Sequence, residues 1–170
     1  MNIKNMIRNI PDFPRPGVVF LDITPLLLDG ETFRATVESL TEKLTGVDFD
    51  LVAAVEARGV ILGAPVAYAM NKGFVTIRKK GKLPYDTVGV QYQLEYGFDT
   101  LEMHSDAVQP GQRVVFIDDI LATGGTFGAT VGLIEKLGGK VVKSLFLAEL
   151  EELNAREKFK DYDIYCVEKM

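Results

Sequence analysis

Residues 114–126 are the most informative stretch of the chain and read Val114-Val115-Phe116-Ile117-Asp118-Asp119-Ile120-Leu121-Ala122-Thr123-Gly124-Gly125-Thr126. The apolar, β-branched residues of 113–117 predict a buried strand that ends in two carboxylates. A Thr-Gly-Gly-Thr turn follows, and a helix is predicted over 128–137. Glycines let backbone N–H groups approach a ligand closely, and a helix N-terminus carries partial positive charge. The stretch therefore predicts a strand–turn–helix unit that can cradle a phosphate monoester.

Outward from this unit, buried strands alternate with helices. Further strands are predicted over 51–55, 74–77, 141–150 and 163–167, and helices over 31–45 and about 59–70. This alternation is typical of an α/β fold with a mostly parallel central sheet flanked by helices. Ligands of such sheets bind beyond the carboxyl ends of the strands, so we look for functional residues there.

Composition narrows the class of protein. The chain has 170 residues, 19 Lys and Arg against 24 Asp and Glu, one Cys and one His. This length suits one domain, 1–170, and single Cys and His residues exclude a disulfide framework and Cys- or His-rich metal sites. The net charge of −5 argues against a nucleic-acid partner. No apolar stretch approaches the ~20 residues that span a bilayer, so we expect a soluble, cytoplasmic protein.

The two acids beside the turn point to a particular phosphate ester. Carboxylates next to a phosphate repel it. Their presence here makes sense if they accept hydrogen bonds from sugar hydroxyls of the same ligand. A ribose 5-phosphate meets both needs, with its phosphate on Ala122–Thr126 and its diol on Asp118 and Asp119. A Gly-Gly-Thr turn alone would also fit an ordinary helix cap. An acid pair after a strand also occurs in ATPases, but the chain has no Gly-x-x-x-x-Gly-Lys-[Ser/Thr] motif.

Two other segments carry anion-binding side chains. Glu56-Ala57-Arg58-Gly59 follows a predicted strand, and from the residues alone Arg58 either binds an anion near a helix N-terminus or faces solvent. Residues 78–82 hold four basic side chains, a pattern that also fits a solvated face. Apolar and polar residues then alternate over 88–96, which indicates a strand with one polar face. We therefore predict a β-hairpin flap over 79–97, with basic residues at its base and Glu95 at its far end.

Taken together, these blocks resemble the type I phosphoribosyltransferase family. Asp118–Thr126 is similar to its phosphoribosyl pyrophosphate loop. The other matching blocks are Pro16–Phe20, Glu56–Gly59, Arg78–Pro84 and Leu94–Gly97, and the resemblance runs from about Ile10 to Glu157. The order of Gly81-Lys82-Leu83-Pro84 and Leu94-Glu95-Tyr96-Gly97 resembles that in the adenine-specific members. It implies the type I phosphoribosyltransferase fold, with an N-terminal base-binding hood over 1–30 and a flexible flap over 79–97. It also implies purine salvage, in which phosphoribosyl pyrophosphate and adenine give AMP and pyrophosphate.

The resemblance implies a role for each matching residue. The phosphoribosyl group would bind to Asp118, Asp119, Ala122, Thr123, Gly124, Gly125 and Thr126; the pyrophosphate to Glu56, Ala57, Arg58, Arg78, Lys79 and Lys82; and the base to Val19, Phe20 and Leu21. Glu95, Arg58 and Lys79 would be catalytic, with Glu95 exchanging a proton with the purine. Mg²⁺ would be held mainly by the substrate, with no direct protein ligand, and the protein would be a homodimer.

One position departs from the family pattern. Family members usually place Arg or Lys where this chain has Leu21, and leucine cannot donate a hydrogen bond to a base. The same transfer to hypoxanthine or guanine therefore stays open. Two alternatives of another kind are a non-catalytic phosphoribosyl-pyrophosphate-binding regulator and an unrelated sugar-phosphate-binding domain. A regulator would need a nucleic-acid-binding element, and a binding domain would have no use for the basic flap.

Overall fold

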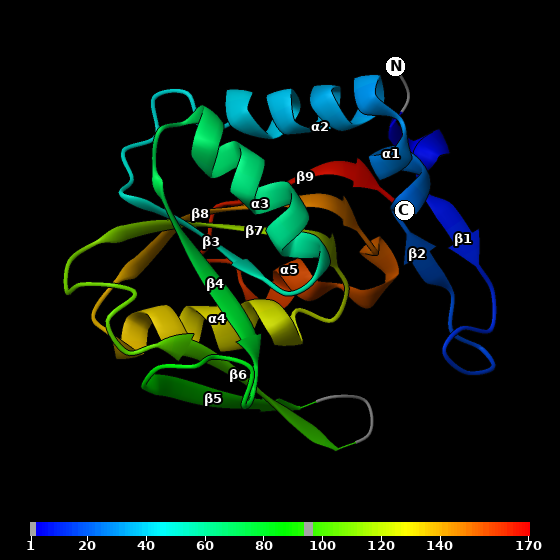
Figure 1. The fold of residues 1–170 in the computed structure, drawn as a ribbon. Helices are drawn as coiled ribbons and strands as arrows, with labels where there is room; N and C mark the ends of the chain where they lie inside the picture. The colour runs from blue at the N-terminus through cyan, green and yellow to red at the C-terminus, as the bar shows by residue number, and fades with distance from the viewer. Residues whose placement is uncertain (1–2, 94–96) are drawn as a thin grey trace.

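The computed structural model describes residues 3–93 and 97–170 and is built around a seven-stranded sheet (Figure 1). Its order is β5-β6-β4-β3-β7-β8-β9. The strands are β3 (Leu51–Val55), β4 (Gly73–Lys79), β5 (Thr87–Gln93), β6 (Phe98–His104), β7 (Arg113–Leu121), β8 (Lys140–Glu149) and β9 (Ile164–Lys169). The neighbouring strands β4, β3, β7, β8 and β9 are all parallel to one another, whereas β6 runs antiparallel to both β4 and β5. The predicted α/β fold with a mostly parallel sheet is confirmed.

Helices cover both faces of the sheet, as Figure 1 shows. The helices α2 (Gly30–Glu42) and α3 (Arg58–Ala69) lie on one face, and α4 (Gly125–Lys136) and α5 (Ala155–Lys158) lie on the other. Each face has its own apolar cluster, with Leu40, Leu62 and Val115 in the first and Phe116 and Phe127 in the second. The strands are apolar on both faces because both are covered.

The N-terminal segment forms a separate small sheet. It contains η1 (Ile3–Met6), β1 (Arg8–Ile10), β2 (Phe20–Asp22) and α1 (Thr24–Leu28), and β1 pairs with β2 antiparallel. The proline-rich loop 11–17 joins these two strands. The predicted base-binding residues Phe20 and Leu21 therefore lie on a strand that does not belong to the central sheet.

Several predicted boundaries differ from those of the structure. The helix predicted over 128–137 begins at Gly125, so Gly125 and Thr126 lie in its first turn. The strand expected to end before the acids continues to Leu121, so Asp118 and Asp119 lie inside β7, where β8 pairs with the strand to its end. The flap hairpin was predicted over 79–97, but β5 pairs with β6 in the register Thr87↔His104 to Gln93↔Phe98. The paired strands are thus 87–93 and 98–104, and the basic residues 78–82 precede them. Gly81 and Pro84 lie in the segment between β4 and β5.

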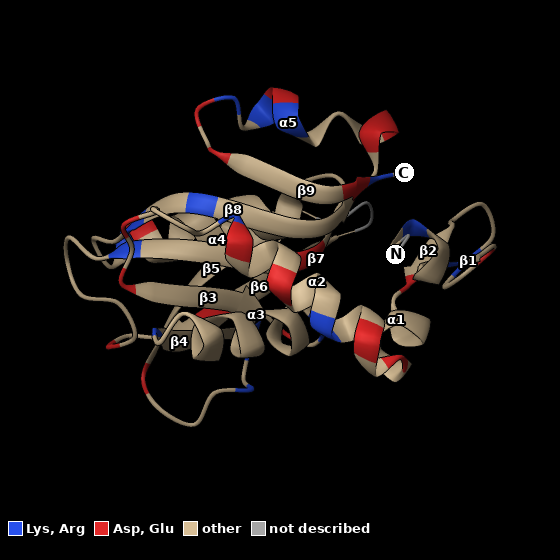
Figure 2. Cartoon of the chain, turned by 90° about the horizontal axis from the view of Figure 1, so that it is seen from above, with Lys and Arg blue, Asp and Glu red and all other residues tan. Residues whose placement is uncertain are grey.

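Lys, Arg, Asp and Glu residues are interspersed along the elements of the chain (Figure 2). Over residues 3–93 and 97–170, no helix has the length and apolar character needed to cross a membrane.

Candidate active site

The phosphate loop connects the buried strand β7 to α4. Asp118 and Asp119 are only 9% and 5% exposed, and Asp118 Oδ1 accepts a hydrogen bond of 2.9 Å from the Asp119 N–H. Gly124 caps α4 with a φ of 82°, a left-handed conformation that suits glycine. The loop therefore brings two buried carboxylates and the N-terminus of a 12-residue helix to one place.

Burial makes these carboxylates unusual acids. It raises the pKa of Asp118 well above the ordinary value, and the neighbouring charge of Asp119 adds to this effect. Burial also raises the pKa of Asp119, although the Arg58 guanidinium opposes the shift. Hydroxyl groups that donate to a carboxylate favour its ionised form. A sugar diol bound here would thus relieve part of the burial cost.

Arg58, at the start of α3, reaches both halves of the site. Its Nε lies 2.8 Å from Asp119 Oδ2, and its Nη1 donates a 2.7 Å hydrogen bond to the Leu21 carbonyl. The guanidinium also lies over the Phe20 ring, 4.7 Å from the centroid. Arg58 therefore ties the predicted base strand to the predicted ribose acids.

Gly59 is required for this close approach. A Cβ at position 59 would lie 2.6 Å from Asp118 Oδ1, and 3.2 Å from the Ile117 carbonyl oxygen. Such a contact is too short for real atoms, so the first turn of α3 can pack on β7 only without a side chain here. This gives the glycine of the Glu56–Gly59 segment a steric role.

The basic residues at the end of β4 are held by acids. Glu56 accepts two hydrogen bonds from Arg78, of 2.9 and 2.8 Å, and one of 2.8 Å from the Lys79 N–H. Burial alone would raise the pKa of Glu56, but these donors keep it below the ordinary value. The Lys79 ammonium lies 3.2 Å from Asp99 on β6. Arg78 and Lys79 thus have defined positions.

Most of the predicted site residues line one cavity of about 410 Å³. Those residues are Val19, Phe20, Leu21, Glu56, Ala57, Arg58, Lys79, Asp118, Asp119, Ala122, Thr123 and Thr126. Gly124 and Gly125 line an adjoining cavity of about 190 Å³, together with Thr123 and Thr126. Arg78 and Lys82 line another cavity beside Glu56 and Ala57. Glu95 lies outside the described residues, so its role stays a prediction.

Leu21 contacts the site residue Arg58 through its backbone carbonyl. Its side chain is 5% exposed and belongs to the apolar cluster beneath the N-terminal segment, while its carbonyl accepts from Arg58. Whether it contacts a base stays a prediction.

The structure also adds cavity residues that the sequence analysis missed. The further residues that line the 410 Å³ cavity are Val18, Val55, Tyr92, Leu101, Ile120, Leu150 and Leu153. Leu150 directly follows the carboxyl end of β8. The rule that ligands bind beyond strand ends could therefore have identified it.

Comparisons with known proteins identify the family of the chain. Residues 27–170 match the family model of the phosphoribosyl transferase domain. The adenine phosphoribosyltransferase of Caldicellulosiruptor saccharolyticus is 55% identical over 167 residues, covering 98% of this chain and 95% of that protein. The corresponding protein of Thermotoga petrophila is 56% identical over 164 residues, covering 96% of each chain.

A solved structure leads to the same family. The crystal structure of adenine phosphoribosyltransferase from Thermoanaerobacter pseudethanolicus superposes with a TM-score of 0.96 at 54% identity, covering 99% of this chain and 98% of that one. With a fold, a cavity and full-length relatives that agree, the chain belongs to the type I phosphoribosyltransferases, in the adenine phosphoribosyltransferase family.

Proposed function

We propose that the protein transfers the 5-phosphoribosyl group from phosphoribosyl pyrophosphate to adenine, giving AMP and pyrophosphate. The observation that carries this proposal is the single cavity shared by Phe20, Arg58, Asp118 and Asp119. An aromatic ring suits a purine, and buried carboxylates suit a ribose diol. The full-length relatives, named adenine phosphoribosyltransferases, favour adenine over hypoxanthine or guanine.

The sugar half of the reaction needs a firmly held ribose. The bond that breaks joins the anomeric carbon to a diphosphate oxygen, and cleavage at such a carbon passes through an oxocarbenium-like transition state. Asp118 and Asp119 would hold the two hydroxyls, and Ala122–Thr126 would hold the 5′-phosphate. Positioning both ends of the sugar leaves the anomeric carbon free to move toward the base.

The diphosphate half needs positive charge for the leaving group. Arg58, Arg78, Lys79 and Lys82 would supply it. Glu56 supports this role because it accepts from Nε and Nη2 of Arg78 and so fixes the guanidinium plane. Lys79 lines the same cavity as the ribose acids.

The base half needs a stacking surface and a proton acceptor. The Phe20 ring would stack on the purine, and the backbone of Val19 would contact its edge. As the base attacks, it must lose a proton, which we assign to Glu95. We also propose that the flap closes over the substrates to exclude water, which would otherwise hydrolyse the sugar.

A magnesium ion is expected on the substrate. The described residues contain no group of three or more His, Cys, Asp or Glu side chains that could hold a metal, and Asp119 is paired with Arg58. This donor set fits an ion carried by the diphosphate, the ribose hydroxyls and water. When bound, Mg²⁺ would neutralise charge on the diphosphate leaving group.

We further propose a homodimer. On α3, Ile61 and Tyr68 are 40% and 89% exposed, and their spacing of seven residues places them on one helix face. Sedimentation velocity would test the dimer, and a monomer at micromolar concentration would contradict it. The cytoplasmic location stays a prediction.

One assay tests the proposed function. Purified protein with phosphoribosyl pyrophosphate and Mg²⁺ is given adenine, hypoxanthine or guanine in turn, and nucleotide product is measured. We expect AMP with adenine, little product with the other bases, and loss of activity with chelator. Product from hypoxanthine or guanine alone would change the assigned base. Binding of phosphoribosyl pyrophosphate without product from any base would instead support a regulator.

A further inference from the structure

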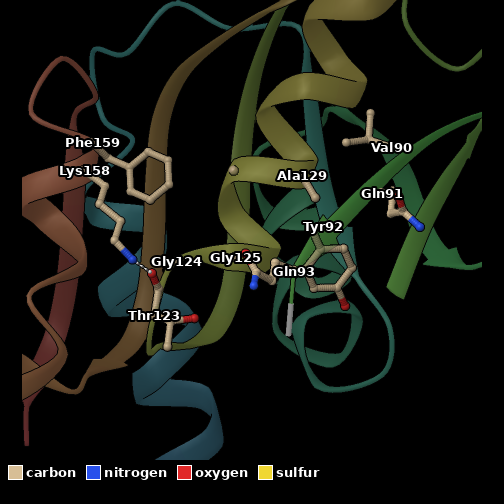
Figure 3. A pocket seen from close by; sticks show the side chains of 11 residues that line it. Val90, Gln91, Tyr92, Gln93, Thr123, Gly124, Gly125, Ala129, Lys158 and Phe159 are labelled. Carbon is tan, nitrogen blue, oxygen red and sulfur yellow. Dashed lines mark hydrogen bonds between the residues drawn. The ribbon is translucent and has the colours of Figure 1, made fainter. Parts of the chain in front are cut away.

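The phosphate loop rests on a short segment near the C-terminus. Figure 3 shows Lys158 and Phe159 on one side of a cavity of about 500 Å³ and Tyr92 and Gln93 on the other. Thr123, Gly124 and Gly125 lie between these two sides.

Phe159 contacts the loop at its glycines. A Cβ on Gly124 would lie 2.5 Å from Phe159 Cε2, and a Cβ on Gly128 would lie 3.3 Å from Cζ. The ring is itself fixed by Phe127, with centroids 4.7 Å apart. The left-handed turn at Gly124 is thus supported directly by an aromatic ring.

Lys158 contacts the loop at a peptide group. Its Nζ donates a 3.3 Å hydrogen bond to the Thr123 carbonyl, drawn as a dashed line in Figure 3. In a trans peptide the carbonyl and the following N–H point in opposite directions. Because the Thr123 carbonyl faces Lys158, the N–H of Gly124 points away from α5. Lys158 therefore fixes the direction of one of the amides at the N-terminus of α4.

The segment that carries these residues is anchored to the sheet. Arg156 on α5 lies 2.8 Å from Glu149 Oε2, and its Nη1 donates a 2.8 Å hydrogen bond to the Ile164 carbonyl. Glu149 is buried, whereas the Arg156 side chain is 40% exposed, so this half-buried ion pair ties α5 to the end of β8. A helix of four residues has little stability of its own, and this anchor explains how it can support a loop.

We propose that Lys158 and Phe159 are positioning residues for the 5′-phosphate: they hold the Thr123–Gly124 peptide so that the Gly124 N–H faces the bound phosphate. Neither residue touches the reacting atoms. The inference rests on the proposed function in one respect, the assignment of the phosphate to this loop.

Calorimetric titration with ribose 5-phosphate tests Lys158. In Lys158→Met we expect the dissociation constant to rise about threefold to tenfold, the range that one net hydrogen bond is worth. Lys158→Arg should recover most of the affinity, because it keeps a donor. The matched control is Lys160→Met, which removes the same charge from an exposed side chain paired with Glu157 at 2.7 Å. Its affinity should stay within twofold of the wild type.

Titration at high salt separates a positioning role of Lys158 from long-range attraction between its charge and the phosphate. Long-range attraction between exposed charges is screened at about 0.5 M salt. A loss in Lys158→Met that persists at this salt supports the proposal. A loss that disappears there, or an equal loss in Lys160→Met, would overturn it.

Phe159 gives a test without any change of charge. In Phe159→Ala we expect KM for phosphoribosyl pyrophosphate to rise about fivefold or more, with KM for adenine within twofold, since only the phosphate loop loses support. Phe159→Leu keeps apolar volume and should show a smaller effect, and it serves if the alanine variant does not fold. Equal rises in both KM values would indicate a general structural role and would contradict positioning.

The two proposals can fail separately. If the wild type binds ribose 5-phosphate but makes no nucleotide, the proposed function is wrong and the titrations still judge Lys158. If the wild type makes AMP but Lys158→Met and Phe159→Ala bind ribose 5-phosphate normally, only the positioning role is wrong.

Discussion

Arg58 Nε lies 2.8 Å from Asp119 Oδ2, and the same guanidinium lies over the Phe20 ring. One side chain therefore contacts the residues proposed to bind the base and a residue proposed to bind the ribose. The guanidinium also contacts the backbone of the base-binding strand, because Nη1 donates to the Leu21 carbonyl. A change at Arg58 should be felt by both substrates.

Arg58→Lys tests this coupling. Lysine keeps the charge but loses the planar set of donors that reaches Asp119 and Leu21 together. We expect kcat/KM to fall about 10- to 100-fold for each substrate, since a hydrogen bond to a charged group is worth ~1.5–3 kcal/mol. Steady-state kinetics with each substrate varied would measure it. Arg34→Lys, on the exposed face of α2, is the control. A loss confined to one substrate would contradict the bridging role.

Gly59→Ala tests the contact between α3 and β7. The new Cβ would lie 2.6 Å from Asp118 Oδ1, so the carboxylate must move. We expect ribose 5-phosphate affinity to fall at least about tenfold, because charge-assisted hydrogen bonds depend strongly on geometry. Gly30→Ala is the matched control, since a Cβ there meets nothing within 4 Å. Unchanged affinity in Gly59→Ala would remove Asp118 from the ribose site.

Asp118→Asn should weaken ribose 5-phosphate binding and raise the thermal stability of the protein. Burial raises the pKa of Asp118, so the folded protein binds this proton more tightly than the unfolded chain does. The wild type therefore loses stability as pH rises from the unfolded-state value of about 3.9 through the raised folded-state pKa. Asparagine stays neutral, so the variant should melt above the wild type at pH 8, by about 2–4 °C per kcal/mol recovered.

Thermal melts between pH 5 and 8 would measure this difference, which should shrink toward the acid end. Ribose 5-phosphate affinity should fall in the same variant. Asp106→Asn, at an exposed position, should leave both the melting curve and the affinity unchanged. A variant that is less stable than the wild type at pH 8 would show that the Asp118 charge is not penalised in the empty site.

Glu95→Ala tests the predicted proton acceptor. We expect kcat to fall at least about 100-fold, within the range that general acid–base catalysis contributes, while ribose 5-phosphate binds as in the wild type. Rapid-quench measurement of AMP formation would separate chemistry from product release. Glu38→Ala removes an exposed carboxylate from α2 and is the control. Unchanged turnover would remove Glu95 from the chemistry.

The sequence predicted the central fold well because buried strands carry a strong local signal. Leu51–Val55 is a strand over the predicted residues, and β7 was found from the apolar run before the acids. The N-terminal strands were missed because β1 and β2 have only three residues each and include charged side chains. The flap pairing was wrong because a pattern of period two shows that a strand exists, but not which neighbour it joins.

The site was predicted as a set of residues but not as a set of contacts. Side chains from the ends of β3, β4, β7 and β8 meet in one cavity because parallel strands end at the same edge of the sheet. The direction of Arg58, between Asp119 and Phe20, depends on tertiary packing that no local pattern encodes. The support of the phosphate loop by Phe159 was missed for the same reason, since 35 residues separate Phe159 from Gly124 along the chain.

The small sheet of β1 and β2 is separate from the sheet that carries the phosphate loop. Mutations in the exposed loop 11–17 can therefore accumulate without disturbing the strand that holds Asp118 and Asp119, whereas Leu21 of β2 is buried in the same apolar cluster as Val115 and Ile117 of that strand. Over evolutionary time, this separation would allow descendants to acquire a different nucleobase while keeping the ancestral sugar-phosphate half. Arg58 contacts both the base-binding strand and the ribose-binding acids. A change of base specificity that displaces Arg58 should therefore weaken the binding of base and ribose alike.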